Sequence, residues 1–522
     1  MFGILKNRQN LKISQTKDKF TWKNSKSNLG ITITVVLLWG FLACWAVSSP
    51  VGSAGDDNYH LASIWCSSTS EGLCKKSGES FTVPKPIAGN SYKCFIQWER
   101  IDQSKYNQSA KCINSGTTAP ETVNYLNNNN KMYPNLYYDI SGLFAGDSVN
   151  KSVISIRLFW GTLFSGLTLW ILLFGRKESK VSVLFTILLF LVPVPAFLLV
   201  STNPTAGCLV SLFVLPHLLK YFQEQVGIKR RISWIVILLM VLLSSGSRTD
   251  GGFFAVALIT CWAILNHKSI PIRSILSVLT PASLIALGSS LLIITQSKSV
   301  GLQAVASHPS SALLDFSLLG SNLLNLYKYY VGIWGLDWSL GWRYEPELPD
   351  TMSYLQAIFL IFIIWKFIRI QNIAQKLAII FVLLVLLFVP LYIFQISGSR
   401  IGELVQPRYL TPFVIGVFSM AMIELKKPLK SYLPKTILVT GFVFLSVSLI
   451  AFKAQLTRVT KGADGDIFGS TEASDWWWSG AQVSPGGLFI LFLIITTLLT
   501  ISLVTLLREY LRKETELLEV KR

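Results

Sequence analysis

The feature that most constrains this chain is a series of apolar runs of membrane-spanning length that recur from residue 30 to residue 507. A helix needs about 20 apolar residues to cross the hydrocarbon core of a bilayer. Only 14% of the residues are charged, against about 25% in a soluble globular protein. The sequence therefore predicts an all-α, polytopic integral membrane protein, and it excludes a soluble enzyme and a nucleic-acid-binding domain.

We expect about twelve transmembrane helices. Three of the segments are short for a span, so this number carries a margin of two. The first segment follows a 29-residue polar leader and has no small-x-small site after it, so we expect a retained helix and not a cleaved signal peptide. The segments lie at 30–49, 153–175, 181–201, 206–221, 232–245, 252–267, 273–295, 353–369, 376–396, 408–424, 434–452 and 487–507.

The placement of Lys and Arg sets the expected orientation. With the N-terminus inside, the internal loops and the two basic tails, 1–29 and 508–522, hold 28 of the 47 basic residues. The positive-inside rule thus explains the net charge of +19 without a nucleic-acid partner. We expect a multi-pass protein of the plasma (inner) membrane with both termini cytoplasmic and the lipid bilayer as its partner.

The same map places every long loop outside, at 50–152, 296–352 and 453–486, and loops of that size usually carry function. The spans between them hold almost no ionisable groups, which counts against an ion-coupled transporter. The transmembrane blocks are helix 1 at 30–49, helices 2–7 at 153–295, helices 8–11 at 353–452 and the last helix at 487–507.

Four of the seven cysteines fall in the first external loop: Cys66, Cys74, Cys94 and Cys112. An external loop faces an oxidising compartment, and four cysteines allow three pairings among which the sequence cannot choose. A zinc site is the alternative, but the spacings lack a Cys-x-x-Cys pair. We expect two structural disulfides, each stabilising the loop by roughly 2–4 kcal/mol.

An acidic motif directly follows the first span and contains Asp56, Asp57 and His60. One of the carboxylates could abstract a proton from an acceptor hydroxyl as a general base. Alternatively, the pair could hold a divalent cation, Mg or Mn, that neutralises a phosphate leaving group. If a helix begins here, Asp56 and His60 share one face. A third interpretation is that Asp56 only caps a juxtamembrane helix.

Arginines near the external ends of spans are candidate anion ligands. Arg248 lies in a glycine-containing turn with Asp250, where it could clamp a phosphate or simply pair with that carboxylate. Arg157 is costly inside a span unless it is paired, so it could hold a loop carboxylate or a donor phosphate. Arg408, followed by Tyr409, opens a late span, and we favour a lipid phosphate there over snorkelling to the interface.

Two further segments favour a membrane interface. The triplet that contains Trp477 could stack on a sugar, although tryptophans at this place are more often interface anchors. The amphipathic segment 311–345 is expected to lie on the outer leaflet, where it could cover a groove for a lipid substrate. The chain has no P-loop and no dinucleotide motif, which argues against a soluble nucleotide-sugar donor.

These patterns resemble two groups of known proteins. An acidic residue just past the first span is typical of GT-C glycosyltransferases, integral membrane enzymes that use lipid-linked sugar donors. The closer resemblance is to an uncharacterised bacterial multi-pass family with a Pro-Asp-Glu-x-x-His motif at this place. Asp56, Asp57 and His60 match its last three defined positions, with Asp for Glu and Gly55 in place of the proline.

Four more motifs of that family follow in order, so the resemblance covers about residues 30 to 425. Tyr-Pro-Asn-Leu-Tyr-Tyr at 133–138 is similar to a Pro-Pro-Leu-Tyr-Tyr stretch, and Arg-Leu at 157–158 opens the second span as it does in the family. The residues at 332–337 resemble a Gly-x-aromatic-Gly-x-x-Asp element. Those at 406–410 resemble a Gln-Gly-Arg-Tyr motif, with proline for the glycine.

The resemblance implies a GT-C-like fold and, as an expectation, transfer of a sugar from a polyprenyl-phosphate-linked donor to a cell-envelope glycan acceptor at the outer face. Asp56 would be the base or metal ligand, with Asp57 as its alternate and His60 orienting it. Arg408 and Arg248 would neutralise the departing lipid phosphate. A lipid-linked glycan transporter or flippase, an envelope-glycan polymerase and a structural scaffold are the alternatives.

Overall fold

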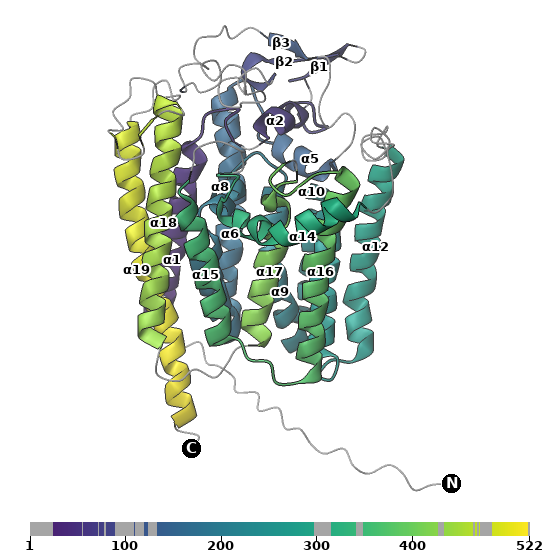
Figure 1. Cartoon of the computed structure of the whole chain (residues 1–522), viewed down its shortest axis with the longest axis vertical. Coiled ribbons are helices and arrows are strands. Elements are labelled where there is room, and N and C mark those ends of the chain that lie inside the picture. Colours follow the sequence, from purple (N-terminus) through teal and green to yellow (C-terminus); the bar gives the residue numbers. More distant parts are fainter. Residues whose placement is uncertain are drawn as a thin grey trace.

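The structure is a computed structural model in which long helices form one bundle, with short helices and a small sheet at one end (Figure 1). We call this end, at the top of Figure 1, the upper end. The structure describes all residues except 1–24, 55, 71, 78–79, 89–108, 110–119, 124–132, 297–314, 341–347, 404, 426–432, 463–464, 467–468, 470–482 and 520–522.

The elements fall into long bundle helices and short elements, most of which lie at the upper end. The long helices are α1 (Ser25–Val47), α6 (Val149–Phe174), α7 (Lys177–Phe190), α9 (Thr205–Glu224), α10 (Gly227–Ser247), α11 (Thr249–Asn266), α12 (Ile272–Gln296), α14 (Phe316–Val331), α15 (Asp350–Phe367), α16 (Ile373–Ser397), α17 (Thr411–Glu424), α18 (Leu433–Lys461) and α19 (Pro485–Glu519). The short elements are α2 (Asp57–Trp65), β1 (Lys75–Ser77), β2 (Ser80–Pro84), η2 (Lys85–Ile87), β3 (Pro120–Val123), α5 (Leu136–Gly142), α8 (Val194–Leu199), η5 (Gly332–Trp334) and η6 (Pro407–Tyr409).

Nine of the described helices are long and apolar enough to cross a membrane: α1, α6, α9, α11, α12, α15, α16, α18 and α19. The predicted span 181–201 is instead divided between α7 and α8, because prolines at 193 and 195 interrupt the helix. The predicted span 408–424 contains the 14-residue α17. The architecture is that of an all-α polytopic membrane protein, while the number of twelve spans stays a prediction.

The interior of the bundle is built around α9 and α1. In the most apolar window of α9, 89% of the residues are buried, against 17% for α12, which lies at the edge of the bundle (Figure 1). Phe452 and Phe492 stack with ring centroids 3.7 Å apart, and Trp45 packs edge-on against both. Because lipid is as apolar as these side chains, close packing is what holds α1, α18 and α19 together.

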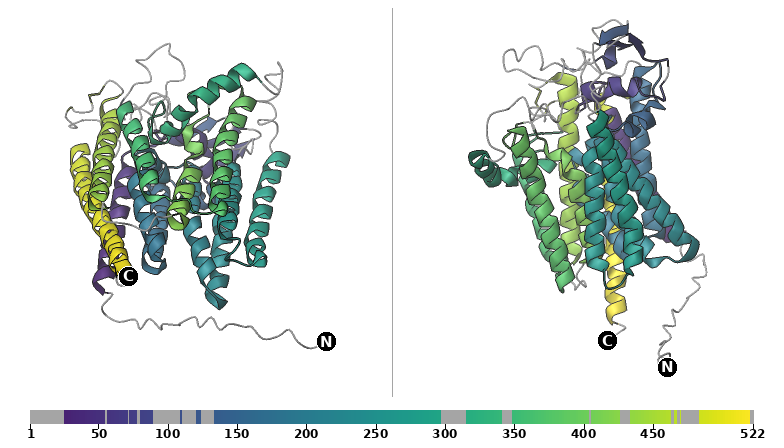
Figure 2. Two further views of the ribbon diagram at one scale, coloured as in Figure 1. Left: turned by 60° about the horizontal axis from the view of Figure 1, so that its bottom comes forward. Right: turned by 90° about the vertical axis from the view of Figure 1, so that its right-hand side faces the viewer.

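The two ends of the bundle differ in what they carry. α1 begins and α19 ends at the lower end, where the two helices lie in contact (Figures 1 and 2). Ion pairs at the lower end join Arg176 to Glu224 at 2.7 Å and Lys220 to Glu424 at 3.3 Å. The upper end carries α2, α5 and an antiparallel sheet in the order β1-β2-β3, so the described part of the first long loop folds there.

A disulfide joins Cys66, at the end of α2, to Cys74, directly before β1. This bond confirms one of the two expected disulfides and selects the partner of Cys66, which the sequence left open. Cys94 and Cys112 lie outside the described residues, as does Trp477.

Candidate functional site

The turn between α1 and α2 holds Asp56 in a left-handed backbone conformation, with φ at 63°. Such a φ is uncommon outside glycine, although aspartate tolerates it better than most residues. Asp56 occupies the N-cap position of α2, but its side chain makes no capping hydrogen bond. It turns instead toward the bundle, where it pairs with Arg408 and accepts a hydrogen bond from Asn203 Nδ2 at 3.4 Å.

The two side chains of the Asp56–Arg408 ion pair differ in their exposure to solvent. The Asp56 side chain is 21% exposed, whereas that of Arg408 is 1% exposed. Burial alone would raise the pKa of Asp56, but the nearby Arg408 guanidinium holds it below its usual value. The carboxylate is therefore ionised at neutral pH, and one side of it can be reached from outside the protein.

Asp57 points the other way and is fully buried. It accepts hydrogen bonds from the backbone amides of Gly52 and Ala54, at 3.1 and 3.2 Å, and from the Thr202 hydroxyl. Its ion pair with Arg157 Nη2, at 3.2 Å, fixes the start of α2 against α6. Because both carboxylate oxygens of Asp57 accept hydrogen bonds, this side chain anchors the turn. Arg157 thus holds a loop carboxylate, as one of its two interpretations predicted.

His60 lies one turn along α2 and is fully buried among tyrosines. Its Nδ1 lies 2.8 Å from the Tyr138 hydroxyl, and its ring centroid lies 5.1 Å from those of Tyr133 and Tyr59. Burial lowers the pKa of His60 to about 3, so the ring is neutral at pH 7. Among the described residues, its Nε2 has no hydrogen-bond partner.

Arg248 joins the site from the turn between α10 and α11. It donates two hydrogen bonds to Asp250, at 2.9 and 2.6 Å, and one to the Thr205 hydroxyl. The intraloop Arg–Asp pair is therefore formed, as one of the two interpretations predicted. Its guanidinium also lies 4.6 Å from the centroid of the Tyr409 ring, which Arg408 approaches to 5.7 Å. One tyrosine thus contacts both arginines.

A model of the predicted membrane protein family DUF2142 matches residues 38–417, which is most of the chain. The chain belongs to this family. The match contains Asp56, Arg248 and Arg408, so the whole candidate site lies within the DUF2142 region. Neither the curated proteins nor the solved structures include a match.

The donor set of the DUF2142 site does not suit a divalent cation. Asp56 turns to Arg408 and Asp57 to Arg157, so the two carboxylates do not converge on one point. Across the described part of the chain, no three His, Cys, Asp or Glu side chains form a group that could hold a metal. We therefore derive no chemistry from a cation here.

Two features of the DUF2142 region escaped the sequence reasoning. From the loop before α9, Asn203 contacts Asp56 and Thr202 contacts Asp57. A polar Ser-Thr-Asn-Pro-Thr run at 201–205, between apolar segments, is the sequence signal that could have identified them. The motif at 332–337 also meets the motif at 406–410. A Cβ added to Gly332 would lie 2.4 Å from Pro407, so η5 packs directly on the element that carries Arg408.

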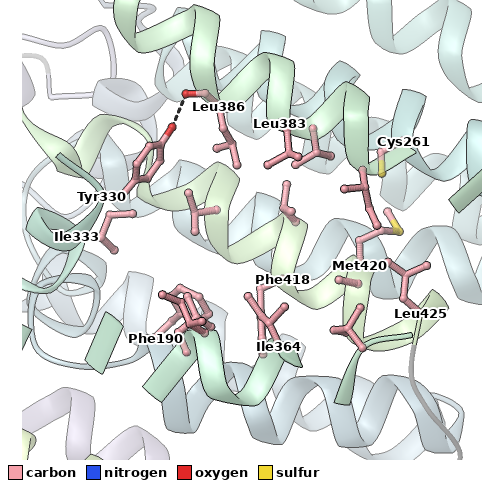
Figure 3. A pocket seen from close by; sticks show the side chains of 18 of the residues that line it. Phe190, Cys261, Tyr330, Ile333, Ile364, Leu383, Leu386, Phe418, Met420 and Leu425 are labelled. Carbon is pink, nitrogen blue, oxygen red and sulfur yellow. Dashed lines mark hydrogen bonds between the residues drawn. The ribbon is translucent and has the colours of Figure 1, made fainter. Parts of the chain in front are cut away.

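A large apolar pocket lies below α14, between α15, α16 and α17, with a volume of about 600 Å³ (Figure 3). Tyr330 stands at its upper boundary, where the hydroxyl donates to the backbone oxygen of Leu386, and Leu425 lies at the opposite end. α14 falls within the segment that the sequence predicts to be amphipathic, and it lies across the bundle as the roof of this pocket (Figure 1).

Proposed function

We propose that this DUF2142 protein is a membrane glycosyltransferase of GT-C type that transfers a sugar from a polyprenyl-phosphate-linked donor to a cell-envelope acceptor at the outer face. The observation that supports this most is the Asp56–Arg408 pair, a part-exposed carboxylate beside a buried guanidinium at the end of the bundle. A base and an anion ligand in contact are what transfer from a phosphate-linked donor requires.

In this proposal the donor phosphate takes Arg408 from Asp56. The freed carboxylate then accepts the proton of the acceptor hydroxyl as the oxygen bonds to the anomeric carbon of the sugar. The bond between that carbon and the phosphate oxygen breaks, and the lipid phosphate leaves with the electron pair. Arg408 neutralises the departing charge, and Arg248 adds positive potential from across Tyr409.

The pocket below α14 suits the hydrocarbon chain of the donor. Its lining is almost entirely apolar. The pocket extends from Tyr330, at its upper boundary, to Leu425 at the opposite end of the pocket. η5 lines the pocket through Ile333 and Trp334 and packs on Pro407, next to Arg408. A chain in this pocket would therefore place its phosphate close to the arginine. An apolar lining suits a lipid tail better than the passage of a sugar headgroup, which favours transfer over flipping.

The test is surface-glycan composition in a deletion strain complemented with variants whose membrane levels are checked by immunoblotting. Asp56→Asn should insert normally and fail to restore the glycan, because the amide cannot accept the proton. The matched control is Asp139→Asn, which changes a carboxylate of α5 that accepts hydrogen bonds from Ser68. Asp139→Asn should restore the glycan.

Asp57→Asn should reduce the amount of inserted protein, because Asp57 is a buried anchor. If Asp56→Asn at wild-type level restores the glycan fully, the carboxylate is not the base and the proposed mechanism is wrong. Transport or scaffolding would then be the better interpretation.

A further inference from the structure

A second pocket, of about 470 Å³, lies between α5, α10 and α12. Three of its lining residues, Leu242, Leu284 and Leu292, are exposed on the sides of α10 and α12. α12 is an apolar, membrane-length helix at the edge of the bundle (Figure 1). Because α12 is long and apolar enough to cross a membrane, we expect hydrocarbon beside this pocket and an occupant with at least one apolar part.

The lining of this pocket is mainly apolar and includes a few polar residues. Ser289 of α12 donates a hydrogen bond to the backbone oxygen of Ser245 at 2.9 Å and so joins the two helices. The Ser245 hydroxyl is buried and, within the described part of the chain, has no hydrogen-bond partner. Asn135 and Tyr133 are further polar residues of the lining. Apolar walls with a small number of polar groups match an amphiphile with a hydrocarbon chain and a polar headgroup.

Tyr133 connects this pocket to the candidate site. Its ring lines the pocket and lies 5.1 Å from the ring of His60 and 5.8 Å from that of Tyr59. Asp56 lies just beyond these rings. Its backbone oxygen accepts a hydrogen bond from the backbone amide of His60 at the start of α2. A headgroup that passes Tyr133 would therefore approach the carboxylate from a pocket separate from the one below α14.

We infer that the acceptor is itself a membrane lipid, one that carries a free hydroxyl in its headgroup and lays its hydrocarbon chain between α10 and α12. The inference rests on the proposed function and names the acceptor class for the same site. In the transfer step, the lipid hydroxyl gives its proton to Asp56 and its oxygen bonds to the anomeric carbon. The donor phosphate departs with the electrons of the broken bond. The product is a glycolipid, and the two lipids enter from separate pockets.

Glycine at 288 offers a direct way to block this pocket. Gly288 lines the pocket, and a Cβ built there has no atom within 4 Å apart from its own helix and chain neighbours, so Gly288→Trp should fill the space without displacing the bundle. The matched control is Gly166→Trp on α6, where a Cβ also meets nothing within 4 Å and which does not line the pocket. Leu292→Trp is a second blocking variant at an exposed position.

The probe is a diacylglycerol with a diazirine in one acyl chain, in phosphatidylcholine nanodiscs with the full-length protein. After irradiation, cross-links should map to residues 242–246 and 284–292. Gly288→Trp and Leu292→Trp should reduce them at least about tenfold, the effect of losing about 1.4 kcal/mol of binding free energy. Gly166→Trp should keep wild-type labelling. Labelling spread evenly over α6 and α12, or unchanged in both blocking variants, would overturn the inference.

The complemented deletion strain separates this inference from the proposed function. Both Asp56→Asn and Gly288→Trp should remove a glycolipid from organic extracts of the cells. If Asp56→Asn removes a surface glycan and Gly288→Trp leaves it at the level of Gly166→Trp, the transferase stands and the lipid acceptor is wrong. If neither variant changes any glycan, both proposals are wrong.

Discussion

Two adjacent aspartates have opposite surroundings, and the backbone between α1 and α2 is the reason. The left-handed conformation of Asp56 turns its side chain to Arg408, while Asp57 begins α2 and points back to Arg157. Asp57 is fully buried, whereas Asp56 remains partly exposed. Two neighbouring carboxylates thus have different partners and different exposure.

The buried pair should make Arg157 essential for folding. Arg157→Met leaves Asp57 as a buried charge without its cation, which typically costs about 3–5 kcal/mol. Thermal unfolding in detergent should show a clearly lower midpoint than wild type. The control is Arg176→Met, which breaks a pair whose arginine is 65% exposed, and such a pair contributes at most about 1 kcal/mol. An equal drop in the unfolding midpoint of Arg157→Met and Arg176→Met would contradict the expectation that the buried pair contributes more to stability than the exposed pair.

The site should be insensitive to pH over the physiological range. The Asp56 pKa is held below its usual value, so the carboxylate stays charged at high pH and loses its pair only as pH falls through that low pKa. Burial also keeps His60 neutral, with a pKa of about 3. Sugar transfer by wild-type membranes should therefore show no titration step between about pH 5 and pH 8. A step near pH 6.5 that His60→Gln abolishes would contradict this expectation.

At the scale of the elements, hydropathy predicted most of the helices but not how they end. Prolines at 193 and 195 divide one predicted span into α7 and α8, a local effect that an average over 20 residues hides. The candidate residues Asp56, Arg248 and Arg408 were named from the sequence because charge near apolar runs is conspicuous. Asn203, which donates a hydrogen bond to Asp56, was not named, because the loop before α9 and the turn before α2 become neighbours only through helix packing.

Close packing of α17 on α9 depends on Gly416. A Cβ there would lie 2.5 Å from Leu258 Cδ1 and 2.9 Å from the backbone oxygen of Leu212, which cannot move aside easily. Gly416→Ala should therefore destabilise the protein by about 1–3 kcal/mol, as overpacking does. The unfolding midpoint in detergent measures this, with Gly166→Ala as the control in open space. A Gly416→Ala midpoint at or above that of the control would refute the packing argument.

At the scale of the whole molecule, the lower end should face the cytoplasm. Within the described residues, the basic connections that follow α6, α9, α11 and α15 lie there, as the positive-inside rule requires. Cysteines introduced at exposed positions of each end test this: Asp147→Cys before α6 and Lys268→Cys between α11 and α12. A membrane-impermeant maleimide should label the first in intact cells and the second only after permeabilisation. The reverse pattern would invert the proposed topology.

The pair between Asp56 and Arg408 joins positions 352 residues apart. At a synthesis rate of about 5–20 residues per second, Asp56 waits roughly 18 to 70 seconds after its own synthesis before Arg408 is made. During that interval the first helices insert and pack with an acidic turn that lacks its cation. Completion of the site is therefore a late event of biogenesis, and a nascent chain truncated before Arg408 carries the carboxylate without this cation.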